Sequence, residues 1–240
     1  MRLKIMCDLS NEKFPLNFRR KILMVFKTGL KKAYPEVFED LYGANRQKDF
    51  TFAVYFQDAV FGKEDITVKG KRLIINFSTG NAEQAIIFYN AFMKLRREQI
   101  KISDVCQLEV KSVDMVRIAP IETKSIVLRT LSPIVCRDHN RETQKDWFYM
   151  FEDEQFIPIL KRNLRIKLEG KYGSFIAQDI EKMKIKPINM KKTVAQHYDI
   201  SIVCSLGLIE VEAEKYLLEH IVESGFGALT GMGFGMLAQQ

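Results

Sequence analysis

A glycine-rich segment near the C-terminus has the residue types and spacing to bind an anion through its backbone. Residues 225–227 and 233–235 each read Gly-Phe-Gly, and five residues separate them. Glycine adopts positive φ without steric cost but loses much entropy when ordered, so this density requires a structural reason. Successive N–H groups in such loops form concavities that bind phosphate. We therefore predict phosphate contacts from Gly225, Gly227, Gly233 and Gly235, with a tight turn for packing alone as the alternative.

Basic side chains are concentrated in two parts of the sequence. Residues 158–192 include ten basic and three acidic residues, an excess equal to the +7 of the whole chain, and residues 19–32 include no acidic residue. Lys and Arg contacts to phosphate dominate nucleic-acid affinity, although a single charge run is usually a solvated face. We predict that both segments line one trough for an extended polyanion. The predicted contacts are Arg19, Arg20, Lys161, Arg162, Arg165, Lys167, Lys171, Lys184, Lys186, Lys191 and Lys192.

Hydrophobic periodicity predicts the elements that position these residues. In the first half of the chain, the predicted elements are strand 1–9, helices 16–34 and 35–41, strand 50–56, a hairpin of 65–68 with 72–77, a helix after Asn81 to 97, and strand 100–116. In the second half, they are strand 125–135, helix 154–168, strands 175–185 and 193–205, helix 210–224 and strand 232–238. The order β-α-β-β-α-β predicts an α+β fold of tandem ferredoxin-like (RRM-like) domains. We place the domains at residues 1–119 and 120–240.

Composition sets the broad class of the protein. The chain has 240 residues, 47% of them hydrophobic, which is ample for two packed cores. The N-terminal residues alternate apolar and charged, and no apolar run approaches the roughly 20 residues of a membrane span. The cysteines form no CxxC pair, so we expect reduced thiols in a cytoplasmic protein with neither a metal site nor a cofactor.

Three sequence stretches resemble one known family. The paired Gly-Phe-Gly units resemble the signature loop of CRISPR-associated endoribonucleases that process repeat transcripts, within the repeat-associated (RAMP) superfamily. Residues 130–135 (TLSPIV) resemble the strand that opens the family's second domain, and residues 14–19 (FPLNFR) resemble its entry into the first helix. The resemblance spans the chain and implies tandem ferredoxin-like domains with CRISPR repeat RNA as the partner. It also implies metal-independent cleavage, in which a 2′-hydroxyl attacks its own 3′-phosphate and leaves a 2′,3′-cyclic phosphate and a 5′-hydroxyl.

The same resemblance indicates where cleavage takes place. The family typically has a histidine after the first helix, and Tyr42 occupies about that position here. Lys48 matches a lysine that often follows the histidine. Arg46 and Lys48 could lower the tyrosine pKa from its ordinary value of about 10 and make it a base, or they could hold the RNA in line. We assign the cleavage site to Tyr42, Arg46 and Lys48, supported by Lys27 and Lys31.

The absence of that histidine leaves three functions open. The first is the endoribonuclease described above, which would process precursor transcripts into guide RNAs. The second is a repeat-RNA-binding subunit of a CRISPR effector complex that does not cleave, and the third is a structural subunit whose basic face contacts other proteins. The sequence permits a monomer or a homodimer. His139, His197 and His220 do not have the positions of a substitute base, so we expect structural roles for them.

Overall fold

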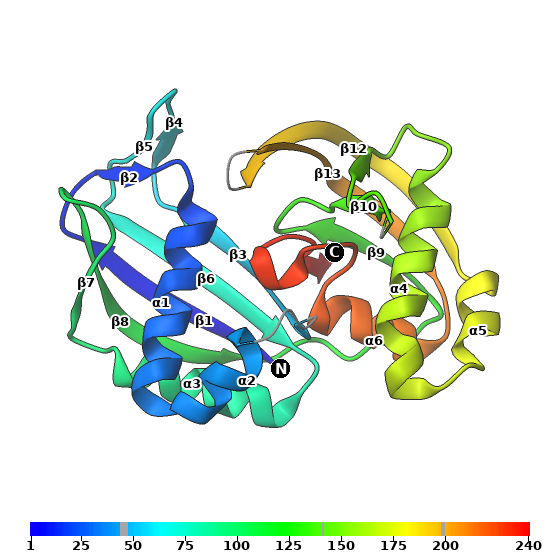
Figure 1. The fold of residues 1–240 in the computed structure, drawn as a ribbon, viewed down its shortest axis with the longest axis horizontal. Coiled ribbons are helices and arrows are strands. Elements are labelled where there is room, and N and C mark those ends of the chain that lie inside the picture. Colours follow the sequence, from blue (N-terminus) through cyan, green and yellow to red (C-terminus); the bar gives the residue numbers. More distant parts are fainter. Residues whose placement is uncertain (44–47, 141, 198–199) are drawn as a thin grey trace.

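The structure of the protein, a computed structural model, describes residues 1–43, 48–140, 142–197 and 200–240 (Figure 1). We call residues 1–119 the first half and residues 120–240 the second half. The first half contains β1 (Arg2–Leu9), β2 (Lys13–Pro15), α1 (Phe18–Ala33), α2 (Pro35–Tyr42), β3 (Phe50–Phe56), β4 (Ala59–Phe61), β5 (Asp65–Val68), β6 (Arg72–Thr79), α3 (Ala82–Lys94), β7 (Gln99–Lys101) and β8 (Gln107–Val116). The second half contains β9 (Ser125–Thr130), β10 (Cys136–His139), β11 (Asp146–Tyr149), α4 (Phe156–Tyr172), α5 (Ile176–Lys182), β12 (Lys184–His197), β13 (Ile200–Glu212), α6 (Lys215–Ser224), the 3₁₀ turn η1 (Thr230–Met232) and β14 (Leu237–Gln239).

The first half is built on an antiparallel sheet in the order β3-β6-β1-β8-β7. Buried and less buried residues alternate along β1, which is typical of a strand with one face on a core. Helices α1 and α3 pack on that face, where rings of Phe26, Phe52, Phe77 and Phe88 are in contact. Numbered along the predicted unit, strands β1, β3, β6 and β8 have the spatial order 2-3-1-4, which is the ferredoxin-like arrangement.

The second half repeats this arrangement. Its sheet has the order β12-β13-β9-β14, so its strands also follow the spatial order 2-3-1-4. Helix α4 follows the first of these strands and α6 follows the third, and both contribute buried side chains to the second core. The tandem ferredoxin-like fold predicted from the sequence is thus confirmed, whereas the boundary at residues 119 and 120 stays a prediction.

Several predicted elements are wrong in type or pairing. The hairpin of 65–68 with 72–77 does not form, because β5 pairs with β2 and β4 while β6 lies between β1 and β3. An apolar pattern identifies a strand but not its partner. Residues 176–182 form helix α5 rather than a strand, since buried Ile176 and Ile180 have helical spacing. Residues 210–212 end strand β13, and only residues 237–239 of the predicted last strand pair.

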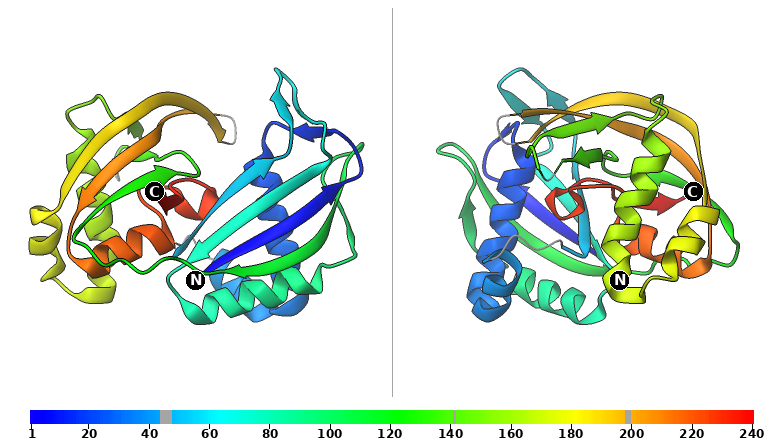
Figure 2. Two further views of the ribbon diagram at one scale, coloured as in Figure 1. Left: turned by 180° about the vertical axis from the view of Figure 1, so that it is seen from behind. Right: turned by 45° about the vertical axis from the view of Figure 1, so that its right-hand side comes forward.

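The two halves are joined at the end of the first sheet where strands β1 and β3 begin. The Thr51 hydroxyl donates a buried hydrogen bond of 2.8 Å to the carbonyl oxygen of Phe234. The Arg2 guanidinium donates to the carbonyl oxygens of Val222 and Leu237, and the Gly80 N–H donates to the Ser224 hydroxyl. In both views of Figure 2, the C-terminal segment lies between the two sheets. The halves therefore share a polar, well-bonded junction.

Two further features concern the class of the protein. Within the described ranges, every helix is either too short or too polar to cross a lipid bilayer. In the same part of the chain, His, Cys, Asp and Glu side chains do not gather into groups of three that could hold a metal ion. The cysteines Cys7, Cys106, Cys136 and Cys204 are free and buried.

Candidate active site

The glycine-rich segment is a packed turn between the two halves. Gly225, Gly227, Gly233 and Gly235 have φ values of +85°, +92°, +85° and +67°, so the predicted need for positive φ is met. The N–H groups of Gly225, Gly233 and Gly235 donate to the carbonyl oxygens of Ile221, Thr230 and Pro133. These three glycines are also buried. Their predicted phosphate contacts are therefore contradicted, because the amides are already used inside the protein. Gly227 is half-buried, and its contact with RNA remains a prediction.

Arg19 is half-buried against this segment. Its Nε donates to the carbonyl oxygen of Gly233 at 3.2 Å, and its guanidinium lies 4.4 Å from the centroid of the Phe234 ring. Burial lowers the pKa of Arg19 to about 10. The predicted RNA contact of Arg19 is therefore contradicted, since the guanidinium is used to attach α1 to the second half. Arg20, its neighbour, is exposed, and its contact with RNA stays a prediction.

Those predicted cleavage residues that the structure describes come together where α1, α2 and the start of β3 meet. The Nζ atoms of Lys27 and Lys48 lie 4.7 Å and 5.2 Å from the centroid of the Tyr42 ring. One turn along α1, Lys31 Nζ lies 4.5 Å from the Phe38 ring centroid. Cations over aromatic faces are attracted by the ring quadrupole, so the rings of α2 hold a row of ammonium groups. We call Lys27, Lys31 and Lys48 the lysine cluster.

Tyr42 cannot be the base that the sequence suggested. Its hydroxyl is buried and has no hydrogen-bond partner among the residues that the structure describes. Burial raises the pKa of Tyr42, whereas we expected nearby cations to lower it. Desolvation of the phenolate outweighs the attraction of the lysines, which lie over the ring face rather than at the oxygen. Arg46, the second cation expected to lower this pKa, lies outside the described residues.

Lys48 is the member of the cluster whose acid–base properties are altered. Burial lowers the pKa of Lys48, and the like charge of Lys27 lowers it further. The side chain of Lys48 runs along Gly231, where a Cβ atom would come within 2.8 Å of Lys48 Cβ. Gly231 thus serves a close approach rather than an unusual φ, and it places the glycine-rich segment directly against the lysine cluster.

Behind Lys48 lies a buried polar group that the sequence did not predict. Lys167 Nζ of α4 lies 3.5 Å from Asp49 Oδ1, and His220 Nε2 of α6 lies 4.0 Å from the same oxygen. The Lys167 side chain is 8% exposed and that of His220 is 2% exposed. Burial would raise the pKa of Asp49, but Lys167 and further partners outweigh this effect and lower it. Lys167 therefore does not contact RNA as predicted, because it is buried and ion-paired.

Helix α4 retains most of its predicted basic face. In Figure 1, α1 and α4 both lie on the near side, each in front of its own sheet, and Figure 2 shows the glycine-rich segment between them. Arg162 and Arg165 are exposed, with ion pairs to Asp138 and Glu169. Lys161 donates to the carbonyl oxygen of Glu181, and Lys171 lies over the Tyr172 ring. This face stays a candidate for RNA contact.

The basic side chains of strand β12 do not form the single continuous surface that the sequence suggested. Lys184 is ion-paired with Glu212, which reduces its free charge. Lys186, Lys191 and Lys192 are exposed, but consecutive residues of a strand point to opposite faces. Lys191 and Lys192 therefore cannot line one side of a trough together, and their individual contacts with RNA remain predictions.

The remaining histidines have the following positions. His139 Nδ1 lies 2.7 Å from Asp146 Oδ1 on the β10–β11 hairpin. His220 is buried at the junction, in agreement with the structural role expected for it. His197 ends β12, and its side chain lies outside what the structure describes.

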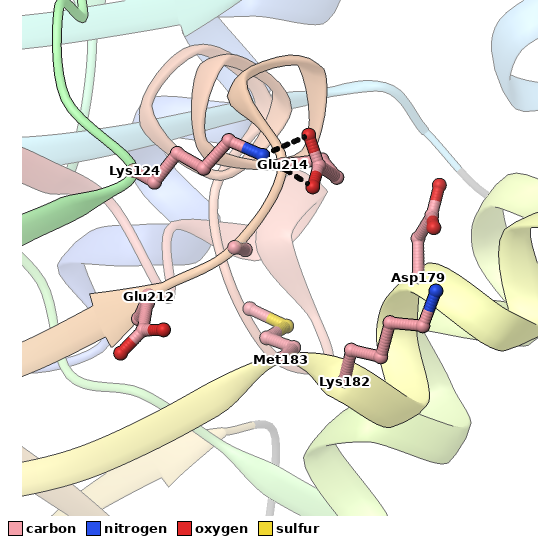
Figure 3. A pocket seen from close by; sticks show the side chains of 7 residues that line it. Lys124, Asp179, Lys182, Met183, Glu212 and Glu214 are labelled. Carbon is pink, nitrogen blue, oxygen red and sulfur yellow. Dashed lines mark hydrogen bonds and ion pairs between the residues drawn. The ribbon is translucent and has the colours of Figure 1, made fainter.

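A pocket in the second half lies between α5 and the chain that joins β13 to α6 (Figure 3). Its charged lining includes Lys124, Lys182 and the acidic residues Asp179, Glu212 and Glu214. Lys124 bonds both carboxylate oxygens of Glu214, at 2.8 and 3.1 Å. Because acidic groups outnumber basic ones, the pocket repels phosphate, and we do not assign it to RNA.

Comparisons with known proteins identify the family of this chain. The CRISPR-associated endoribonuclease Cas6 1 of Methanocaldococcus jannaschii is 27% identical over 246 residues, which cover 98% of this chain and 92% of the relative.

Two solved structures share the fold. One is the structure of an RAMP protein binding different RNA substrates. It has a TM-score of 0.86 at 21% sequence identity, and the alignment covers 100% of this chain and 99% of that protein's chain. The other, of a Cas6-related gene product from Pyrococcus furiosus, has a TM-score of 0.83 at 22% identity and covers 100% and 98%. The sequence profile described as CRISPR associated protein Cas6, C-terminal, matches residues 114–238. Since this match includes more than half of the residues, the chain belongs to the Cas6 family of CRISPR-associated proteins.

Proposed function

We propose that this chain is an endoribonuclease that binds CRISPR repeat RNA and cleaves precursor transcripts into guide RNAs. Membership in the Cas6 family and the likeness to a relative named as an endoribonuclease support this activity. The observation that carries the assignment of the site is the lysine cluster, in which Lys27 and Lys48 both lie over the Tyr42 ring. Two ammonium groups over one ring, with that of Lys31 over the neighbouring Phe38 ring, form an environment for a phosphate that becomes more negative during reaction.

The chemical step follows from what these residues offer. The 2′-oxygen of the RNA gives its proton to solvent water and bonds to the adjacent phosphorus, and the bond from phosphorus to the 5′-oxygen breaks. The products are a 2′,3′-cyclic phosphate and a 5′-hydroxyl, so a proton must reach the leaving oxygen. Lys48 suits that role because its lowered pKa eases proton donation. Lys27 and Lys31 stabilise charge on the non-bridging oxygens, while Tyr42 supports Lys27 and Lys48 through its ring.

RNA binding would extend from this site along α4. Arg20 on α1, the half-buried Lys161 and the exposed residues Arg162, Arg165 and Lys171 belong to helices on the same side of the molecule (Figure 1). Contacts of this kind go to the RNA backbone and recognise its shape rather than its sequence.

A cleavage assay with the cognate repeat RNA in EDTA tests the proposal. We expect a product that carries a cyclic phosphate, identified by mass spectrometry, and a loss of at least about 100-fold in rate for Lys48→Ala, since general acid catalysis typically contributes that much. Lys69→Ala, an exposed lysine outside the lysine cluster, is the control. Tight binding of repeat RNA without any product would overturn the proposal.

The same outcome would support a second function, a repeat-RNA-binding subunit that does not cleave. A specific observation favours it: the residue at the family's histidine position is Tyr42, whose pKa is raised and whose hydroxyl is buried. A group of this kind neither accepts nor donates a proton near neutral pH. If the chain does cleave RNA, the lysines and the in-line positioning of the RNA must together account for the whole rate acceleration.

A further inference from the structure

We propose that Lys167 and Asp49 form a positioning pair, through which the second half of the chain fixes Lys48 in the cleavage site of the first half. This inference rests on the proposed function, because it assigns a role in the same reaction. Asp49 follows Lys48 in the sequence and precedes β3. Lys167 lies on α4, more than a hundred residues away along the chain.

The backbone next to Lys48 is held from two directions. The Thr79 hydroxyl of the first half donates to the Asp49 carbonyl oxygen at 2.7 Å. Lys167 Nζ of the second half lies 3.5 Å from the Asp49 carboxylate and 3.5 Å from the carbonyl oxygen of Ser224. With its main chain and its side chain both held, Asp49 has little freedom to rotate, and Lys48 is bonded directly to it.

The stem of Lys48 is confined by the second half as well. Its Cβ and Cδ atoms lie where a side chain on Gly231 would begin, at 2.8 and 3.0 Å. Lys48 thus lies between the Tyr42 ring on one side and the glycine-rich segment on the other. Lys167 and Gly231 both belong to the second half, so its docking determines the direction of the Lys48 ammonium group.

The energetics of the pair also favour a geometric role. Lys167 is 8% exposed, and burial lowers its pKa although Asp49 opposes this effect. Removing two charges from water costs about as much as their attraction returns, so a buried pair contributes little net stability. The pair instead holds Asp49, the residue before β3, at a fixed position relative to α4.

The test is whether Lys167 acts through Lys48. Single-turnover rates at saturating protein would be measured for Lys167→Met and Asp49→Asn, each alone and combined with Lys48→Ala. We expect each single substitution to lower the rate by about 10- to 100-fold, since an error of about 1 Å in a catalytic group costs that much. The RNA dissociation constant should change less than about twofold, because a buried lysine does not touch phosphate. In the Lys48→Ala background, neither substitution should lower the rate further.

Lys215→Met is the matched control, because Lys215 forms an exposed ion pair with Glu219 within one helix. An equal loss from Lys167→Met with and without Lys48 would overturn the proposal, as would a loss explained by weaker RNA binding. Lys167→Arg, which keeps the charge, should recover part of the rate. Circular dichroism of each variant distinguishes loss of the fold from displacement of the Lys48 side chain in a folded protein.

A readout that does not depend on cleavage distinguishes failure of this inference from failure of the proposed function. Acetylation of Lys48 by acetic anhydride, followed by mass spectrometry across pH, reports its environment in the RNA-free protein. Lys167 is not among the groups that lower the pKa of Lys48. Removing the charge of Lys167 therefore has little direct effect on the pKa of Lys48. We expect Lys167→Met to change Lys48 labelling while that of exposed Lys69 stays the same. Unchanged Lys48 labelling would overturn the positioning role even if the wild-type protein does not cleave.

Discussion

Lys48 combines two properties that a cleavage residue needs, a lowered pKa and a fixed position. Burial and the charge of Lys27 both favour loss of its proton. An ordinary lysine with a pKa of about 10.4 is a weak acid at neutral pH, so a lower pKa brings proton donation closer to the working range. The family's histidine has a pKa near neutrality without such help, whereas here burial and the charge of a second lysine would lower the pKa of Lys48.

A pH–rate profile tests this use of Lys48. If the protonated ammonium is the active form, the rate decreases as the pH rises through the pKa of Lys48. Lys27→Met removes the like charge, so that pKa should rise and the alkaline limb should move to higher pH. The single-turnover rate would be measured over pH 6–11 for both proteins. A limb that stays in place, or a rate that rises through it, would contradict the assignment of Lys48 as the acid.

Two glycines of the same segment should give opposite phenotypes. A Cβ atom at Gly231, where φ is not positive, would meet Lys48 Cβ at 2.8 Å, so Gly231→Ala should displace Lys48 and slow cleavage. At Gly233, where φ is +85°, a Cβ would lie 2.6 Å from the Phe52 ring. Gly233→Ala should therefore lower the free energy of unfolding by more than about 1 kcal/mol. Thermal denaturation and cleavage rates of both variants measure this, and similar losses of stability would refute the distinction.

Sequence reasoning proposed residues for the candidate site but not their surroundings. The lysine cluster was expected from the family resemblance and the positive φ of the glycines from their density, and the structure has both. The burial of Arg19, Lys167 and His220 does not follow, because each is covered by residues from the other half of the chain. A basic residue in a charge run looks the same in sequence whether it contacts solvent or a buried carboxylate.

Among the elements, helix α4 is where the basic face is best preserved. Trp147, the one tryptophan of the sequence, is 65% exposed on β11 and lies opposite Asp138, which pairs with Arg162 of α4. RNA bound along α4 should therefore change Trp147 fluorescence. We expect saturable quenching by a non-cleavable repeat RNA, weakened by salt. Binding seen by filter retention without any change in fluorescence would place the RNA on another surface.

The salt dependence of affinity tests the same helix. Arg165 is 52% exposed, and its ion pair with Glu169 lies on the same helix, so it is available to phosphate. For single-stranded RNA, each lost phosphate contact reduces the slope of log affinity against log salt by about 0.7. Arg165→Ala should show this reduction, and Lys167→Met should show none, because Lys167 is buried. Equal slopes for Arg165→Ala and the wild type would remove Arg165 from the RNA-binding face.

The elements predicted correctly are those with one strong pattern. Strand 50–56, the long helix that became α1 and the Asn81-capped helix α3 all have clear periodicity or a capping residue, and the structure confirms them. Helix α5 was missed because two buried isoleucines over seven residues do not define a period. The partners of β5 were missed because pairing depends on the whole sheet and not on the strand itself.

For the whole molecule, the junction determines how stability depends on pH. His220 is 2% exposed in its side chain, and burial lowers its pKa, an effect that the charges of Lys167 and Lys171 increase and that of Asp49 opposes. In the unfolded chain the pKa returns to about 6.5. Below that pH the unfolded state therefore binds a proton that the folded state does not, and stability falls as the pH falls.

The expected size is set by linkage. One proton of difference changes the free energy of unfolding by up to about 1.4 kcal/mol for each pH unit. Denaturant titrations of the wild type and of His220→Gln between pH 7 and pH 5 would measure it. The wild type should lose stability over this range, and the variant should lose less, because glutamine does not titrate. Asp49 does not contribute to the change in stability between pH 7 and pH 5. Its pKa lies below this range in the unfolded chain and is lowered further in the folded protein. Parallel curves for the two proteins would show that His220 takes up its proton in the folded state, which would require the junction between the halves to admit water.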